Sequence, residues 1–185
     1  MKKLLTIILC MLLVFTFAAC GTSTDENTVP SGAEEGTDIS MEEGDVFTFA
    51  TETINGEAFT SDNIKDAELV IVNLWEPWCG PCVNEMPALE QIYEEYHGKG
   101  VEILGVFATL DQTEDALKII QENNITYPII KMSQEFTSFQ TQYVPTTVFL
   151  DGEGKLMDAE PLIGAQPYES WKELVEELLE EAKND

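Results

Sequence analysis

Two cysteines with two residues between them are the part of this 185-residue sequence best suited to chemistry. Cys79-Gly80-Pro81-Cys82 follows a pattern typical of a buried strand and precedes one typical of a helix. The reactive form of cysteine is the thiolate, and a helix N-terminus lowers the thiol pKa from about 8.5 to between about 3.5 and 7.5. The spacing brings the second sulfur close enough to form a disulfide with the first. The pair therefore predicts thiolate attack by Cys79 and resolution by Cys82.

The residues around this pair indicate which elements must position it. Residues 69–75 form a continuous apolar run typical of a strand covered on both faces, and Cys82 leads into a helical pattern that ends near residue 96. Further strands are predicted at residues 101–108, 127–130 and 146–150, and further helices after residues 111 and 167. Strands that alternate with helices predict an α/β fold with helices on both faces of the sheet.

Turn and capping residues add detail to this fold. Asn55-Gly56 predicts a β-hairpin near the start of the domain. Asp111, with Glu114 three positions later, predicts a side-chain N-cap for the helix that follows. Residues 146–150 are expected to pair with residues 155–159 across a short turn.

The N-terminal residues have the pattern of an export signal. Two lysines precede an apolar run at residues 4–19, which is shorter than the roughly 20 residues that a membrane-spanning helix needs. Residues 1–19 are therefore predicted to be a signal peptide. Phe17-Ala18-Ala19-Cys20-Gly21 resembles the lipobox of bacterial lipoproteins, which implies that Cys20 is lipidated and becomes the mature N-terminus. Ordinary cleavage beside an incidental cysteine and an uncleaved anchor are the alternatives.

The charge distribution separates a spacer from a domain and excludes one class of partner. Residues 20–45 contain acidic and small polar residues and no basic residue, so they are predicted to be a disordered tether. Residues 46–185 then form the folded domain.

The whole chain has 9 basic residues, all of them lysine, against 35 acidic ones, a formal net charge of −26. Phosphate binding needs clustered cations, so nucleic acid is excluded as a partner.

The redox motif and its surroundings resemble the TlpA/ResA branch of membrane-anchored thiol-disulfide oxidoreductases, which belongs to the thioredoxin superfamily and is related to the AhpC/TSA redoxins. The resemblance is carried by residues 72–82, by Glu85-Met86-Pro87 and by the hairpin at residues 51–57. The long stretch before Val144-Pro145-Thr146 resembles the extra α/β insertion of this branch, here residues 109–131. The resemblance implies a thioredoxin-like fold: a central mixed sheet flanked by helices, with an N-terminal β-hairpin and this insertion.

The same resemblance assigns roles to individual residues. Cys79 would be the exposed nucleophile and Cys82 the resolving thiol. Glu85 matches an acidic residue that tunes thiol acidity or relays a proton. Asn73 stands where thioredoxins have a buried aspartate, so we interpret it as a hydrogen-bonding core residue. Glu76-Pro77 replaces small residues of the family, which alters the surface beside the motif.

The resemblance also implies a groove that receives the substrate. Pro145 matches the family's cis-proline, and Val144 before it would offer its backbone to an extended peptide. The implied groove consists of five residues: Trp78, Gly80, Pro81, Val144 and Pro145.

Simpler interpretations of these residues stay open. A Cys-x-x-Cys pair is half of a zinc site, but the sequence has no second pair and His97 is its only histidine, so no metal and no cofactor are expected. The cysteines would otherwise form a static structural disulfide. Glu85 would be an ordinary first-turn acid favoured by the helix dipole, and Pro145 an ordinary proline at the entry to a strand.

The function expected from these observations is disulfide exchange outside the cytoplasm. The protein would be lipid-anchored on the extracytoplasmic face of the cell membrane and would reduce disulfides of exported proteins. The resemblance implies a membrane thiol carrier as electron donor, and apocytochromes c or methionine sulfoxide reductases as clients. A thiol peroxidase and a non-catalytic surface lipoprotein are the alternatives. The peroxidase is disfavoured because such sites use an arginine, which this sequence lacks.

Lipidation of Cys20 is directly measurable. We expect mass spectrometry of the mature protein to find an N-terminal Cys20 that carries acyl chains, with residues 1–19 removed. A Cys20→Ala variant is the matched control and should leave the membrane fraction. An unmodified Cys20 at the mature N-terminus would contradict the tether.

Overall fold

The computed structural model of the protein describes residues 45–183. The predicted signal peptide at residues 1–19, the lipidation site Cys20 and almost all of the predicted tether lie outside the described residues. Within residues 45–183, no helix combines the length and the apolar character needed to cross a membrane.

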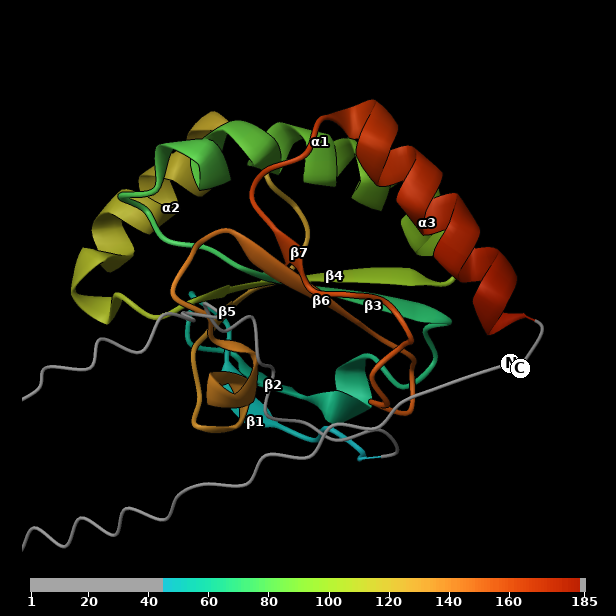
Figure 1. The fold of residues 1–185 in the computed structure, drawn as a ribbon. Coiled ribbons are helices and arrows are strands. Elements are labelled where there is room, and N and C mark those ends of the chain that lie inside the picture. The colour runs from blue at the N-terminus through green and yellow to red at the C-terminus, as the bar shows by residue number, and fades with distance from the viewer. Residues whose placement is uncertain (1–44, 184–185) are drawn as a thin grey trace, which may run out of the picture. The chain divides into compact units, whose positions relative to one another are not determined.

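A five-stranded mixed sheet forms the centre of the described domain (Figure 1). Its strands are, in spatial order, β5 (Ile129–Lys131), β4 (Val101–Phe107), β3 (Leu69–Leu74), β6 (Thr146–Leu150) and β7 (Leu162–Ile163). The first three are parallel to one another, whereas β6 runs antiparallel to β3 and β7 runs antiparallel to β6. The mixed sheet that the resemblance implied is therefore confirmed.

The central strand β3 is buried along its whole length because both of its faces are covered. Ile71 packs into the core on one face, and Val70 and Val72 pack into a second core on the other. This two-sided burial explains why the strand reads as an uninterrupted apolar run instead of an alternating one.

Three α-helices arch over one face of the sheet (Figure 1). They are α1 (Gly80–Tyr96), which continues into the 3-10 helix η2 (His97–Lys99), α2 (Thr113–Glu122) and α3 (Tyr168–Ala182). Met86 and Ile92 of α1 and Trp171 of α3 are fully buried between the helices and the sheet. Pro167 is the N-cap of α3, so this helix begins directly after residue 167, as predicted.

The opposite face of the sheet is covered differently. A hairpin of β1 (Ala50–Glu52) and β2 (Ala58–Thr60) lies there with two 3-10 helices, η1 (Ser61–Asn63) and η4 (Glu135–Phe139). Four phenylalanines fill this layer; the ring centroids of Phe47 and Phe139 lie 4.5 Å apart, and those of Phe49 and Phe136 lie 4.8 Å apart. The sheet is flanked by helices on both faces as expected, but on this face they are short 3-10 helices beside the hairpin.

The predicted insertion is present, although the predicted cap of its helix is wrong. Between β4 and β6 the chain forms the 3-10 helix η3 (Leu110–Gln112), then α2 and the edge strand β5. Asp111 lies inside η3, and the N-cap of α2 is Gln112, which makes no side-chain capping bond. The 3-10 turn has already folded the backbone at Asp111, so this residue cannot take the extended conformation of an N-cap.

The predicted pairing of residues 155–159 with β6 is confirmed only at its start. β6 pairs with β3 on one side and with β7 on the other, whereas residues 155–159 add to β6 only a bridge from Leu156 to Leu150 and a hydrogen bond from the Met157 amide to the Phe149 carbonyl at 3.0 Å. Lys155 instead bridges to Val46, and a hydrogen bond from the Ala159 amide to the Met157 carbonyl closes a tight turn. A tight turn cannot continue a ladder, so regular pairing resumes only at Leu162.

A substitution at Gly105 would measure how closely the elements around β3 are packed. It lies opposite Asn73 in the sheet, and a Cβ atom at Gly105 would lie 2.4 Å from Cδ1 of buried Ile129 and 3.3 Å from the Trp75 indole nitrogen. We expect Gly105→Ala to lower the free energy of unfolding by about 1–3 kcal/mol, because overpacking forces the core to shift. Urea unfolding measures this, with Gly98→Ala as control because no atom lies within 4 Å of a Cβ there. Equal stabilities of the two variants would contradict the prediction.

Candidate active site

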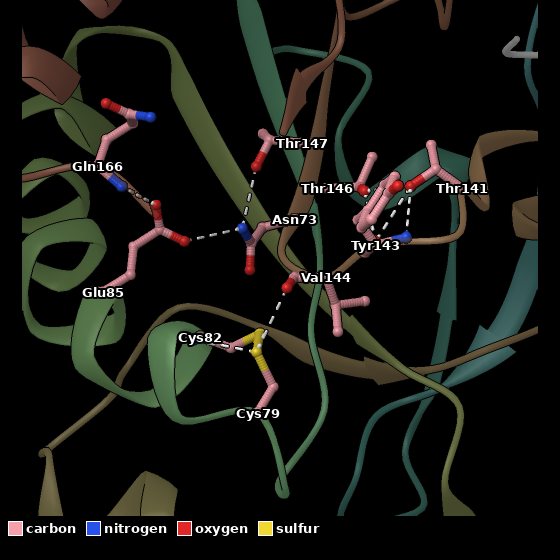
Figure 2. The surroundings of a disulfide bond; sticks show 10 residues. All are labelled: Asn73, Cys79, Cys82, Glu85, Thr141, Tyr143, Val144, Thr146, Thr147 and Gln166. Carbon is pink, nitrogen blue, oxygen red and sulfur yellow. Dashed lines mark hydrogen bonds between the residues drawn. A yellow bond between two sulfur atoms is a disulfide. The ribbon is translucent and has the colours of Figure 1, made fainter. Parts of the chain in front are cut away.

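The two cysteines of the motif form a disulfide at the N-terminus of α1 (Figure 2). Cys79 is the N-cap of the helix, and its sulfur accepts a hydrogen bond from the Cys82 amide at 3.2 Å. Gly80 and Pro81 occupy the first turn, where a proline costs no hydrogen bond because the first amides of a helix have no partner within it. A sulfur at this position lies at the positive end of the helix dipole, which favours its thiolate form after reduction.

The disulfide lies beneath an exposed rim. Cys79 is only 4% exposed and Cys82 is buried as well, whereas Trp78 is 63% exposed and Gly80 and Pro81 are also exposed. The expectation that Cys79 is exposed is therefore wrong for the disulfide form. Its sulfur packs against the chain at Val144, and both cysteines belong to the core between sheet and helices.

Val144 and Pro145 lie directly against the disulfide. The peptide bond between them is cis, as the resemblance implied. The Val144 carbonyl oxygen lies 3.5 Å from the Cys79 sulfur, so the two groups meet although 65 positions separate them in sequence (Figure 2). Val144 is half-buried and Pro145 is buried, and the Pro145 carbonyl accepts the Gly164 amide at 2.9 Å.

Two threonines brace the loop that presents Val144. The Thr146 hydroxyl donates to the Tyr143 carbonyl at 2.7 Å and lies 2.8 Å from the Thr141 hydroxyl. The Tyr143 amide donates to the Thr141 hydroxyl at 3.1 Å. These bonds hold the backbone on the N-terminal side of Val144, so the surface that faces the disulfide is defined before a substrate arrives.

Glu85 is a buried carboxylate on the same helix as the cysteines. It is 3% exposed and lies three positions after Cys82, so the two side chains share a face of α1. One of its oxygens accepts the Gln166 amide at 2.7 Å and the Trp171 indole N–H at 3.1 Å. The other oxygen accepts the side-chain amide of Asn73 at 3.3 Å.

Burial raises the pKa of Glu85 to about 7. The hydrogen bonds from Gln166, Trp171 and Asn73 favour the charged form and lower the pKa, but they do not outweigh the loss of hydration. A carboxyl with this pKa takes up or releases a proton near neutral pH, which suits it to general acid-base chemistry.

Asn73 connects Glu85 of α1 to strand β6. It is buried in β3 and also donates to the Thr147 hydroxyl at 3.0 Å, opposite in the sheet (Figure 2). The interpretation of Asn73 as a hydrogen-bonding core residue is confirmed. Among the described residues, Glu85 has no hydrogen bond to either sulfur, and Figure 2 shows its carboxylate directed towards Asn73.

Two partners of Glu85 were not found from the sequence. Trp171 has no polar role in the predictions from the sequence, although a buried indole N–H needs an acceptor and this requirement is a usable signal. Gln166 donates through its backbone amide, so the identity of its side chain gives no indication of this hydrogen bond. Residues 45–183 contain no cluster of three histidine, cysteine or acidic side chains arranged to hold a metal ion.

The sequence of this chain matches one protein family and several thiol-disulfide oxidoreductases. The AhpC/TSA family matches residues 44–159. The chain is 31% identical over 124 residues to a thiol-disulfide oxidoreductase ResA of Bacillus cereus, a match that covers 65% of this chain and 69% of that protein. It is 28% identical over 158 residues to ResA of Oceanobacillus iheyensis, a match that covers 82% of this chain and 76% of that protein.

Solved structures show the same fold. A thioredoxin-family thiol:disulfide interchange protein from Chlorobium tepidum superposes with a TM-score of 0.65 at 20% identity, over 76% of this chain and 99% of that one. StoA from Bacillus subtilis superposes with a TM-score of 0.57 at 24% identity, over 69% of this chain and 96% of that one. The fold is thus thioredoxin-like, and the chain belongs to the AhpC/TSA family as a thiol-disulfide oxidoreductase.

Proposed function

We propose that this protein acts outside the cytoplasm, is held at the membrane by a lipid on Cys20, and reduces disulfides of exported proteins through Cys79 and Cys82. The observation that carries the proposal is the disulfide at the start of α1 with the Val144 carbonyl 3.5 Å from the Cys79 sulfur. The signal-like N-terminus and the lipobox support the location.

The proposed reaction transfers two electrons in two exchange steps. The Cys79 thiolate attacks one sulfur of the client disulfide; that bond breaks, a mixed disulfide forms, and the first client thiolate leaves and takes up a proton. The Cys82 thiol then loses its proton and attacks the Cys79 sulfur. This step releases the second client thiolate and regenerates the Cys79–Cys82 disulfide. A membrane thiol carrier would return the two electrons.

Two features favour Cys79 as the attacking sulfur. Its position as N-cap gives it a hydrogen bond from the Cys82 amide and the field of the helix dipole, both of which stabilise a thiolate. It also lies against Val144, where an extended client would bind alongside the backbone. Cys82 lies one turn further into the helix and is more deeply buried, which suits the resolving role.

We assign to Glu85 the proton transfer that accompanies resolution. Cys82 must lose a proton before it attacks, and Glu85 shares its helix face. Its pKa of about 7 lets the carboxylate accept that proton and return it near neutral pH.

The net direction is proposed to be reduction. Gly-Pro between the cysteines is the pair found in the reductant thioredoxin, which the motif resembles. Apocytochromes c and methionine sulfoxide reductases are the proposed classes of client. Peroxide reduction is the alternative that the family match raises, but a peroxidatic site of that kind uses an arginine and this sequence has none.

A variant that lacks the resolving thiol should trap the client. In Cys82→Ala, we expect Cys79 to form mixed disulfides that persist, because no second thiolate displaces the client. Non-reducing electrophoresis and mass spectrometry of adducts from living cells measure this. Cys79→Ala is the matched control and should trap none. Absence of adducts from Cys82→Ala, or equal trapping by both variants, would contradict the roles assigned to the two cysteines.

The pKa of Glu85 makes folding stability depend on pH. Because the folded-state pKa is raised from 4.5 to about 7, the contribution of Glu85 is fully present below pH 4.5 and is lost as the pH rises through 7. We expect the oxidised wild type to lose about 3 kcal/mol relative to Glu85→Gln over this range.

Urea unfolding of both proteins between pH 4.5 and 8 tests this expectation. Glu94→Gln, an exposed glutamate on the same helix, controls for the loss of one charge from α1. Parallel stability curves for the wild type and Glu85→Gln would refute a raised pKa at this position.

A further inference from the structure

Glu76 is a second buried carboxylate beside the redox pair, and the reaction above does not use it. It lies three positions before Cys79 and is 8% exposed. One carboxylate oxygen accepts the Ala108 amide and the other accepts the Thr109 amide, each at 3.2 Å. A buried carboxylate is costly unless it is hydrogen-bonded, so these two bonds hold the side chain at the end of β4.

The backbone of Glu76 is bonded to the nucleophile. Its carbonyl oxygen accepts the Cys79 amide at 3.0 Å, and the preceding Trp75 amide donates to the Val106 carbonyl of β4 at 2.9 Å. The side chain of Glu76 is therefore bonded to the end of β4, and its main chain is bonded to Cys79. Displacement of the Glu76 side chain would be transmitted to the turn that carries Trp78 and Cys79.

Glu76 also faces the segment against which the disulfide lies. It lines a small cavity of about 40 Å³ together with Thr141, Tyr143 and Val144. Val144 is the residue whose carbonyl oxygen lies 3.5 Å from the Cys79 sulfur. Glu76 is thus bonded to the main chain of Cys79 and shares this cavity with Val144.

We propose that Glu76 is a positioning residue for thiol-disulfide exchange. Its carboxylate accepts the Ala108 and Thr109 amides, and these bonds fix the turn from Glu76 to Cys79. The position of this turn sets the direction in which the Cys79 sulfur approaches a client disulfide beside Val144. The inference rests on the proposed function, because the meeting of Cys79 with a client is the event that it controls. Its role is mechanical and does not depend on its charge.

Glu90 provides a matched control within the same chain. It is also buried, at 6% exposure, and accepts two successive backbone amides, those of Thr126 at 2.7 Å and Tyr127 at 3.4 Å. It joins the middle of α1 to the segment before β5 and has no hydrogen bond to either cysteine among those the structure describes. Loss of Glu90 therefore measures the cost of removing such a carboxylate away from the redox pair.

The experiment compares Glu76→Ala, Glu76→Gln, Thr109→Pro and Glu90→Ala in the full chain. Three quantities are measured for each: urea stability, the rate at which iodoacetamide alkylates Cys79 in the reduced protein, and the rate of reduction of a disulfide-linked model peptide. Thr109→Pro removes one donor N–H but keeps Glu76 and its charge, and the Thr109 φ of −80° suits proline.

We expect both alanine variants to lose stability. Of these two, Glu76→Ala alone should slow alkylation of Cys79 and reduction of the peptide, by about tenfold, because a small misplacement of a reacting group lowers the rate steeply. Thr109→Pro should slow both reactions in the same direction. Glu76→Gln keeps one acceptor oxygen and should restore part of the lost rate. It also serves as the reporter if the alanine variant fails to fold.

Two outcomes would overturn the inference. Equal alkylation rates in Glu76→Ala and Glu90→Ala would show that Glu76 is only structural. Equal acceleration by Glu76→Ala and Glu76→Gln would show that it acts by charge alone. If the wild type fails to reduce the peptide, the proposed function falls, while the alkylation rates still decide the role of Glu76.

Discussion

The burial of β3 on both faces is the constraint on which the rest of the structure depends. A strand covered by helices on one side and by the hairpin layer on the other holds its end at a fixed place, and the redox pair begins only a short turn after that end. β3 has β4 beside it in parallel orientation and β6 beside it in antiparallel orientation. The C-terminal ends of β3 and β4 and the start of β6 therefore lie at the same end of the sheet. The disulfide, Glu76 and Val144 meet there for this reason.

Buried carboxylates then join the redox segment to the rest of the domain. Glu76 accepts amides at the end of β4, Glu85 accepts donors from β3 and from the start of α3, and Glu90 accepts amides before β5. Among the acids of residues 45–183, these three are the buried ones, and each accepts hydrogen bonds from surrounding donors. Glu85 combines such donors with a pKa of about 7, because there the loss of hydration outweighs the hydrogen bonds.

Several features were predictable because they depend on neighbours in sequence. The apolar run of β3, the hairpin turn at Asn55-Gly56 and the redox pair at the start of a helix each follow from residue types and spacing. The errors have a common origin. Asp111 was expected to cap a helix, but it lies inside a 3-10 helix. Residues 155–159 were expected to pair with β6 along their length, but the pairing stops after Met157, where the Ala159 amide bonds to the Met157 carbonyl. In both cases a competing backbone interaction decided the outcome.

The sequence by itself determined the chemistry of this protein: a thiol pair at a helix N-terminus, and the family to which its surroundings belong. The tertiary structure decided that Cys79 is buried in its disulfide form, that Glu85 receives Gln166 and Trp171, and that Glu76 holds the end of β4. The physical reason is that thiol reactivity and helix periodicity are local properties of the chain. Burial and hydrogen-bond partners are supplied by segments far away in sequence, which come together only when the sheet is packed on both faces.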